Sequence, residues 1–196
     1  VSWRKVTTVS SYWLTVRQIA PDRDGTLWIA ADQGVVHVKS DLSTELFNAK
    51  NTGLTFSSAL LAAVDRNNLK WFLLTGNAGG KSIATFNGTA WRIFSDPACP
   101  VRAEELSRIY TSPYAPVMAF DNWVYDGSSW FDMGRYSSDM VLDHQGVFWS
   151  LHYHYGSVHA GTPSYFEGIW RYDALKKSGS WARSDNYWET PFRPLG

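Results

Sequence analysis

The sequence predicts an all-β domain made of repeated four-stranded antiparallel units. Trp, Tyr and Phe make up 16% of the 196 residues, and aromatic side chains favour the half-buried surface of a pleated sheet. Long stretches with a helical period are missing, and we expect a helical stretch at most near residues 101–106. A large aromatic residue recurs at intervals of 44, 44, 39 and 51 residues, at Trp3, Phe47, Trp91, Trp130 and Trp181. A four-stranded repeat of about 40–45 residues is typical of a β-propeller blade, so we expect a β-propeller or a propeller fragment.

The first half of each expected blade is a pair of apolar runs joined by a polar turn. The first strands are expected over residues 16–21, 60–65, 106–111 and 139–143. The second strands are expected over residues 27–32, 70–76, 116–122 and 147–153. Most of the turns between them contain Asp, Asn or Gly, which suit tight hairpins because they tolerate positive φ or cap their own backbone. Three second strands carry a Trp near their start, and we expect Trp28, Trp71 and Trp149 to pack at equivalent positions between blades.

The second half of each blade is a further pair of short strands. The third strands are expected over residues 34–39, 82–86, 123–126 and 168–173, and the fourth over residues 45–48, 91–94, 129–132 and 180–183. The whole chain, 1–196, is then one propeller domain with four complete blades, at roughly residues 12–48, 56–95, 105–133 and 138–184. Residues 1–6 are an orphan fourth strand that belongs to a preceding blade or closes the ring.

The ends of the chain leave the closure of the propeller open. The chain begins at Val1 without a signal peptide, so we expect a processed product or a piece of a longer polypeptide. After Trp181 only 15 residues remain, which is too few for three more strands of about five residues with their turns. Three alternatives remain: a fragment of a larger propeller, a ring of four blades, or an array completed by a second chain.

The first two units resemble the repeat of two-component-regulator propellers, the sensor propellers of bacterial hybrid histidine kinases and related secreted proteins. The features that carry the resemblance in residues 16–41 are Ile19, Asp22, Gly25, Leu27-Trp28-Ile29 and Gly34-Val35. Residues 61–94 repeat the pattern, whereas the third unit loses its Asp-Gly turn and the fourth contains a long insertion. The resemblance implies a propeller fold and an extracytoplasmic sensing role, in the periplasm, in a secreted protein or at the cell surface.

Composition excludes several classes of function. Lys plus Arg and Asp plus Glu both number 18, and a neutral chain has no global field that attracts nucleic acid or anionic lipid. No run of about 18 apolar residues exists, so we expect no membrane span. The single cysteine, Cys99, excludes an internal disulfide and a cysteine-based zinc site. No motif calls for a cofactor.

The longer connections are all expected on one face of the propeller. The turns between the first and second strands, and between the third and fourth, are uniformly short. The extra residues lie in the other two kinds of connection, at residues 49–58, 76–81, 95–104 and 153–167. Loops that grow on one side of a rigid scaffold are typical of a functional face.

The segment 151–167 (LHYHYGSVHAGTPSYFE) is the richest in candidate contacts. His152 and His154 share one side of an extended strand, and His159 follows in the insertion. Three histidines could bind a metal, but a hydrogen-bonding, aromatic surface for a sugar, peptide or aromatic ligand is the better interpretation. The residues expected to contact the ligand are His152, His154, Tyr155, His159 and Tyr165.

Two hypotheses about function therefore stand, and a third is less favoured. The chain is a non-catalytic module that senses or binds a small ligand such as a glycan, or it is a structural module that binds another protein in a surface assembly. Catalysis as a propeller lyase or hydrolase, with a histidine as the base, is the third. No nucleophile elbow, phosphate loop or carboxylate pair supports it.

Overall fold

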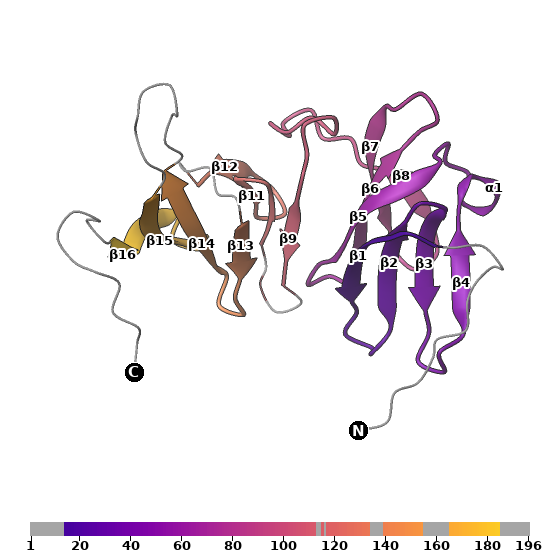
Figure 1. Cartoon of the computed structure of the whole chain (residues 1–196), viewed down its shortest axis with the longest axis horizontal. Helices are drawn as coiled ribbons and strands as arrows, with labels where there is room; N and C mark the ends of the chain where they lie inside the picture. The colour runs from indigo at the N-terminus through magenta and orange to yellow at the C-terminus, as the bar shows by residue number, and fades with distance from the viewer. Residues whose placement is uncertain (1–13, 113–114, 116, 134–138, 155–164, 185–196) are drawn as a thin grey trace.

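The computed structural model contains four antiparallel sheets of four strands each, and in every sheet the strands follow one another in chain order (Figure 1). It describes residues 14–112, 115, 117–133, 139–154 and 165–184. The first sheet comprises β1 (Val16–Pro21), β2 (Leu27–Ala31), β3 (Gly34–Val38) and β4 (Thr44–Phe47). The second comprises β5 (Ser58–Val64), β6 (Lys70–Thr75), β7 (Lys81–Phe86) and β8 (Trp91–Ile93). The third comprises β9 (Ile109–Thr111), β10 (Met118–Phe120), β11 (Trp123–Tyr125) and β12 (Trp130–Asp132). The fourth comprises β13 (Asp139–Leu142), β14 (Val147–His154), β15 (Tyr165–Asp173) and β16 (Ser178–Ser184).

The predicted all-β propeller architecture is confirmed, with two local corrections. The expected helical stretch at residues 101–106 is a run of turns, and the helix of the described chain is α1 (Ala49–Thr52). The sequence of α1 explains its position, because Asn48 caps its first turn and Gly53 ends it in the left-handed conformation. The first strand of the third sheet begins at Ile109 rather than at residue 106, because the Asp121 side chain accepts hydrogen bonds from the backbone N–H groups of Ser107 and Arg108.

One turn motif recurs in three sheets and explains the spacing of Asp and Trp in the sequence. Asp22 Oδ2 accepts a hydrogen bond from Trp28 Nε1 at 3.1 Å. Asp65 and Trp71 make the same bond at 2.9 Å, and Asp143 and Trp149 make it at 3.0 Å. In each case the other carboxylate oxygen accepts a backbone N–H of the turn, so one aspartate fixes both the hairpin and the indole ring. The three Trp residues therefore occupy equivalent positions, as expected. Trp28 and Trp71 also pack against the following sheet, whereas no described sheet follows the one that carries Trp149.

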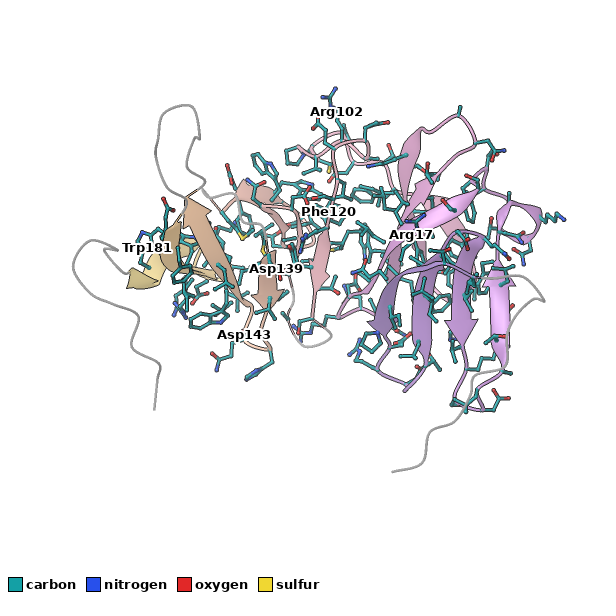
Figure 2. All side chains as sticks on the ribbon, viewed as in Figure 1. Arg17, Arg102, Phe120, Asp139, Asp143 and Trp181 are labelled. Atoms are coloured by element: carbon teal, nitrogen blue, oxygen red, sulfur yellow. The ribbon has the colours of Figure 1, made fainter. Side chains whose placement is uncertain are left out.

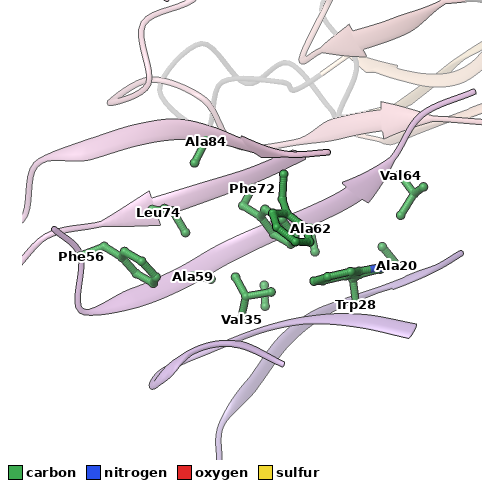
Figure 3. Close-up of a cluster of buried hydrophobic side chains, with 12 residues drawn as sticks. Ala20, Trp28, Val35, Phe56, Ala59, Ala62, Val64, Phe72, Leu74 and Ala84 are labelled. Atoms are coloured by element: carbon green, nitrogen blue, oxygen red, sulfur yellow. The ribbon is translucent and has the colours of Figure 1, made fainter. Parts of the chain in front are cut away.

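Three clusters of buried apolar side chains join neighbouring sheets. The first cluster contains Trp28 and Val35 of the first sheet and Phe72 of the second (Figure 3). The second joins Trp71 to Phe120 of the third sheet, and the last joins Val124 to Phe148 of the fourth. Each sheet thus packs face to face on the next one in the chain.

The sheets fan around the four strands that begin them. β1, β5, β9 and β13 line one hollow, and the first and fourth sheets extend to opposite sides of it, with β4 at one end of the molecule and β16 at the other (Figure 1). The residues 1–6, expected to form an orphan strand, lie outside the described residues. Among the described residues, no helix is long and apolar enough to cross a bilayer.

The two ends of the sheets differ as the sequence predicts. At one end are short turns that follow the first strand of the first, second and fourth sheets and the third strand of all four sheets, and we call this end the tight-turn face. The other end carries the connections at residues 48–57, 76–80 and 94–108, and we call it the loop face (Figure 1).

Candidate functional site

The central hollow has a volume of about 230 Å³ and is lined by all four innermost strands. Its walls are residues 18–21, 62–64, 109–111 and 140–142. Each of these strands lies at the edge of its sheet, with one neighbour in that sheet. The backbone N–H and C=O groups on the free side of an edge strand are therefore directed at the hollow, where they can bind the hydroxyl groups of a ligand. The combination of apolar walls and polar edges is typical of a small-molecule site.

The first two inner strands are joined by a side chain rather than by a ladder. Both strands contain a bulge, between Val16 and Gln18 in β1 and between Ala59 and Leu61 in β5. The Gln18 Oε1 atom accepts a hydrogen bond of 3.1 Å from the backbone N–H of Ala62. A bulge redirects a side chain and interrupts strand pairing, and here the Gln18 side chain joins the two walls of the hollow.

Charged side chains stand at the loop-face ends of the inner strands, just outside the residues that line the hollow, and we call this end its mouth. Arg108 precedes β9 and Asp139 begins β13, and Arg108 Nη1 lies 2.9 Å from Asp139 Oδ1. Arg17, the second residue of β1, is exposed at the same end of its strand (Figure 2). An exposed guanidinium near a concave surface suits a ligand that carries hydroxyl or carboxylate groups.

Tyr110 lines part of the hollow and packs on the apolar cluster between the third and fourth sheets. Burial raises the pKa of the Tyr110 hydroxyl, and the positive charge of Arg108 only partly offsets this effect. The hydroxyl group is therefore protonated at neutral pH, and its oxygen is buried from solvent.

Three of the five sequence-predicted contact residues lie in the two middle strands of the fourth sheet. His154 ends β14, Tyr165 begins β15, and the two are paired in the strand register. His152 is buried in β14, where its Nε2 atom lies 2.9 Å from Ser150 Oγ and its ring meets the edge of Trp181. Tyr155 and His159 lie outside the described residues. The structure thus pairs His154 with Tyr165 in the strand register and gives His152 a packing role in its sheet.

A second hollow of about 320 Å³ lies beneath the connection between the second and third sheets. It is lined by residues that include Lys81, Asp96 and Cys99. Asp96 Oδ2 accepts a hydrogen bond of 2.7 Å from Trp130 Nε1, which anchors this connection to the third sheet. Burial raises the pKa of the Cys99 thiol, so it is a poor nucleophile at neutral pH.

Sequence reasoning missed the charged mouth of the hollow. Arg17, Arg108 and Asp139 each stand within two residues of the start of an innermost strand. The signal in the sequence is a charged residue near the start of three of the four first strands. Within the described ranges, no group of three or more His, Cys, Asp or Glu side chains could hold a metal ion.

The comparisons with known proteins show the fold of this chain. No family model matches the chain, and no curated protein matches it in sequence. Among solved structures, it is similar to a gluconolactonase from Xanthomonas campestris, with 13% identity and a TM-score of 0.50 over 85% of this chain. It is also similar to the extracellular domain of a putative one-component system from B. thetaiotaomicron, with 12% identity and a TM-score of 0.54 over 92% of this chain.

The chain spans only part of each of these structures. It covers 61% of the gluconolactonase chain and 24% of the one-component-system chain. The extracellular domain of a putative hybrid two-component system from B. thetaiotaomicron also matches, at 12% identity and a TM-score of 0.49, over 87% of this chain and 22% of that one.

Proposed function

We propose that this chain is an extracytoplasmic, non-catalytic propeller module that binds a small polar ligand such as a glycan and takes part in sensing it. The observation that carries the proposal is the hollow that four separate sheets line together at their inner strands. The repeat pattern around Asp22, Trp28 and their equivalents supports a relationship to two-component-regulator propellers. A location in the periplasm, in a secreted protein or at the cell surface belongs to the same proposal.

The ligand is proposed to enter from the loop face. Apolar walls such as Ile19 and Ile109 suit the C–H face of a sugar ring, and the edge groups of the inner strands suit its hydroxyl groups. Arg17 and Arg108 would bind a carboxylate or hydroxyl at the mouth. Residues of the insertion in the fourth sheet, His154, Tyr155, His159 and Tyr165, would form the rim, with His152 supporting them from within the sheet.

A thermal-shift screen of the 196-residue chain against mono- and oligosaccharides, uronic acids included, tests the proposal. We expect a sugar that raises the melting temperature, and at least tenfold weaker binding of that sugar by Arg17→Ala or Arg108→Ala. Arg66→Ala is the matched control, because Arg66 is an exposed arginine in a turn of the tight-turn face. Equal losses in all three variants, or full affinity in Arg17→Ala and Arg108→Ala, would refute a site at this mouth.

The contribution of the rim needs its own variant. Replacing His154, Tyr155 and His159 together by Ala should weaken binding of the same sugar while the melting temperature of the free protein stays unchanged. Full retained affinity would remove the insertion from the site and leave the mouth of the hollow as the binding surface.

A second candidate function is a structural module that binds a protein partner. The exposed apolar face of the fourth sheet favours it, since Val141 and Leu151 are both exposed. The two functions differ in the surface used, because a small ligand needs the concave hollow and a protein partner can use a flat sheet. Catalysis as a lyase or hydrolase stays the third and least supported hypothesis.

A further inference from the structure

The outer face of the fourth sheet is formed by the same strand positions as a face that is buried in the first and second sheets. We define this fourth-sheet face by Val141, Trp149, Leu151 and Ile169, which lie opposite one another in the strand register: Val141 pairs with Trp149, and Leu151 pairs with Ile169. In the first sheet the corresponding residues are Ala20, Trp28, Ala30 and Val35, and in the second they are Ala63, Trp71, Leu73 and Ile83.

Burial distinguishes the three copies of this surface. The four positions are at most 6% exposed in the first sheet and at most 5% exposed in the second. In the fourth sheet Val141 is 61% exposed and Leu151 is 43% exposed. A shallow hollow of about 330 Å³ lies over these residues. The sequence motif is the same, so the difference lies in what covers the face.

In the first two copies, the next blade of the repeat covers the face. The Trp28 ring lies 5.8 Å from the Phe72 ring and 5.6 Å from the Phe86 ring of the second sheet. The Trp71 ring lies 5.7 Å from the Phe120 ring of the third sheet. An aromatic residue on the second or third strand of the following blade therefore packs on the Trp of the preceding one.

A charge accompanies the aromatic contact at the first interface. Lys70 begins the second strand of the second sheet, and its Nζ atom lies 3.1 Å from Asp22 Oδ2 in the turn of the first sheet. Asp143 is the equivalent of Asp22, with the same bond to its own Trp149. If another blade packed on the fourth-sheet face, Asp143 could pair with a cation of that blade in the way that Asp22 pairs with Lys70.

The first sheet of the same molecule is not placed to cover this face. The first and fourth sheets extend to opposite sides of the inner strands (Figure 1). Among the described residues, the apolar clusters join the first sheet to the second, the second to the third, and the third to the fourth.

We propose that the fourth-sheet face is an inter-blade surface and that its occupant is a fifth four-stranded blade of this repeat. That blade packs an apolar side chain of its second or third strand on Trp149 and places a cation from its second strand on Asp143. The second sheet of this chain has this chemistry, so a copy of it is a suitable probe.

The test is a chain in which residues 185–196 are replaced by a copy of residues 48–95. β4 ends at Phe47 and β16 ends at Ser184, so the copied blade follows β16 by the same linker that joins the first two sheets. We expect the copied Phe72 to pack on Trp149 and the copied Lys70 to pair with Asp143.

Burial of the face is measured by thiol labelling. The only native cysteine, Cys99, is replaced by Ser, and Val141→Cys provides the probe. Its reaction with a maleimide should be at least tenfold slower in the extended chain than in the 196-residue chain. Leu175→Cys is the matched control, because Leu175 is 59% exposed in a turn of the tight-turn face, and its labelling should be equal in both chains.

Two results would overturn the proposal. One is equal labelling of Val141→Cys in both chains when the far-ultraviolet spectrum shows that the added blade has folded. The other is that Val141→Cys in the 196-residue chain becomes protected from maleimide at high protein concentration, and that Ile19→Lys, on the first sheet, abolishes this protection. In that case a second copy of the chain is the occupant.

A second measurement serves if the extended chain does not fold. In the 196-residue chain, Val141→Ser with Leu151→Ser should reduce binding of a hydrophobic dye with little change in unfolding free energy. Leu73→Ser, at the buried equivalent of Leu151, should destabilise the chain strongly. Comparable losses of stability in the two variants would mean that the face is already packed, and would refute the proposal.

Discussion

Replacing Asp22 by Asn should destabilise the chain far more than the same change at its equivalent, Asp65. Both carboxylates accept a hydrogen bond from the indole of their own Trp and from turn N–H groups. Only Asp22 also pairs with an ammonium group, that of Lys70 at 3.1 Å, and both side chains of that pair are buried. The comparison therefore isolates the ion pair from the turn.

The expected magnitude follows from the groups left behind. Removing one partner of a buried ion pair costs about 3–5 kcal/mol because the other charge stays buried. Lys70 Nζ keeps hydrogen bonds of 2.9 and 2.8 Å to the carbonyl and side-chain oxygens of Asn68, which favours the lower end of that range. Asp65→Asn should cost about 1.5 kcal/mol, since it weakens hydrogen bonds to a charged acceptor. Because Asp22→Asn weakens the same kind of turn bonds and also leaves Lys70 unpaired, it should cost about 3 kcal/mol more than Asp65→Asn, which lowers the urea midpoint by roughly 1–3 M relative to that variant.

Urea unfolding followed by far-ultraviolet circular dichroism measures both variants. A double variant, Asp22→Asn with Lys70→Leu, should recover most of the stability, because Leu27 and Phe148 occupy the position of Lys70 in other sheets. Equal midpoints for Asp22→Asn and Asp65→Asn, or no recovery in the double variant, would refute the assignment of a stabilising buried pair.

Three further predictions concern backbone geometry and titration. Gly34→Ala should lower the free energy of unfolding by at least about 2 kcal/mol, because φ at this position is +131° and the new Cβ would stand 2.2 Å from the Phe47 carbonyl oxygen. A urea-unfolding curve with wild-type stability would contradict this. Burial lowers the pKa of His37, so as the pH falls the unfolded chain binds a proton at this histidine before the folded chain does. Stability should therefore fall as the pH drops below about 6.5, the ordinary pKa of histidine. His37→Phe should make this fall in stability less steep, and an unchanged pH profile of stability would exclude the effect. The Thr26 hydroxyl is the main cause of the lowered pKa of Asp24, so Thr26→Val should raise that pKa in a carboxyl NMR titration, and an unmoved titration curve would argue against it.

Local pattern was sufficient to predict the sheets. The first strand of the first sheet has the predicted bounds, and the bounds of most other strands agree with the prediction within two residues. The reason is that specific turn residues end these strands. For example, Asp22 and Gly25 close one turn by the same backbone hydrogen bond with which Asp143 and Gly146 close another. The third unit agreed least at its start, since its Asp-Gly turn is lost and Asp121 binds residues 107 and 108 from a distant loop. Such a contact between distant segments leaves no periodic signal.

The candidate site was harder to predict, because it is formed by residues that are far apart in the chain. Arg17, Arg108 and Asp139 come from three sheets, and only the radial arrangement of the sheets brings their strands to one hollow. The insertion after His152 was visible as extra length, but the burial of His152 depends on Trp181, which lies two strands later. The Asp–Trp bonds were also unforeseen, although their constant spacing of six residues was present in the sequence.

Amide hydrogen exchange with and without a sugar found by the screen tests the central claim most directly. If the ligand binds in the hollow that the inner strands share, exchange should slow in residues 18–21, 62–64, 109–111 and 140–142, which come from four different sheets. Exchange that slows only in the turns of the tight-turn face, or in one sheet alone, would contradict a binding site on the propeller axis.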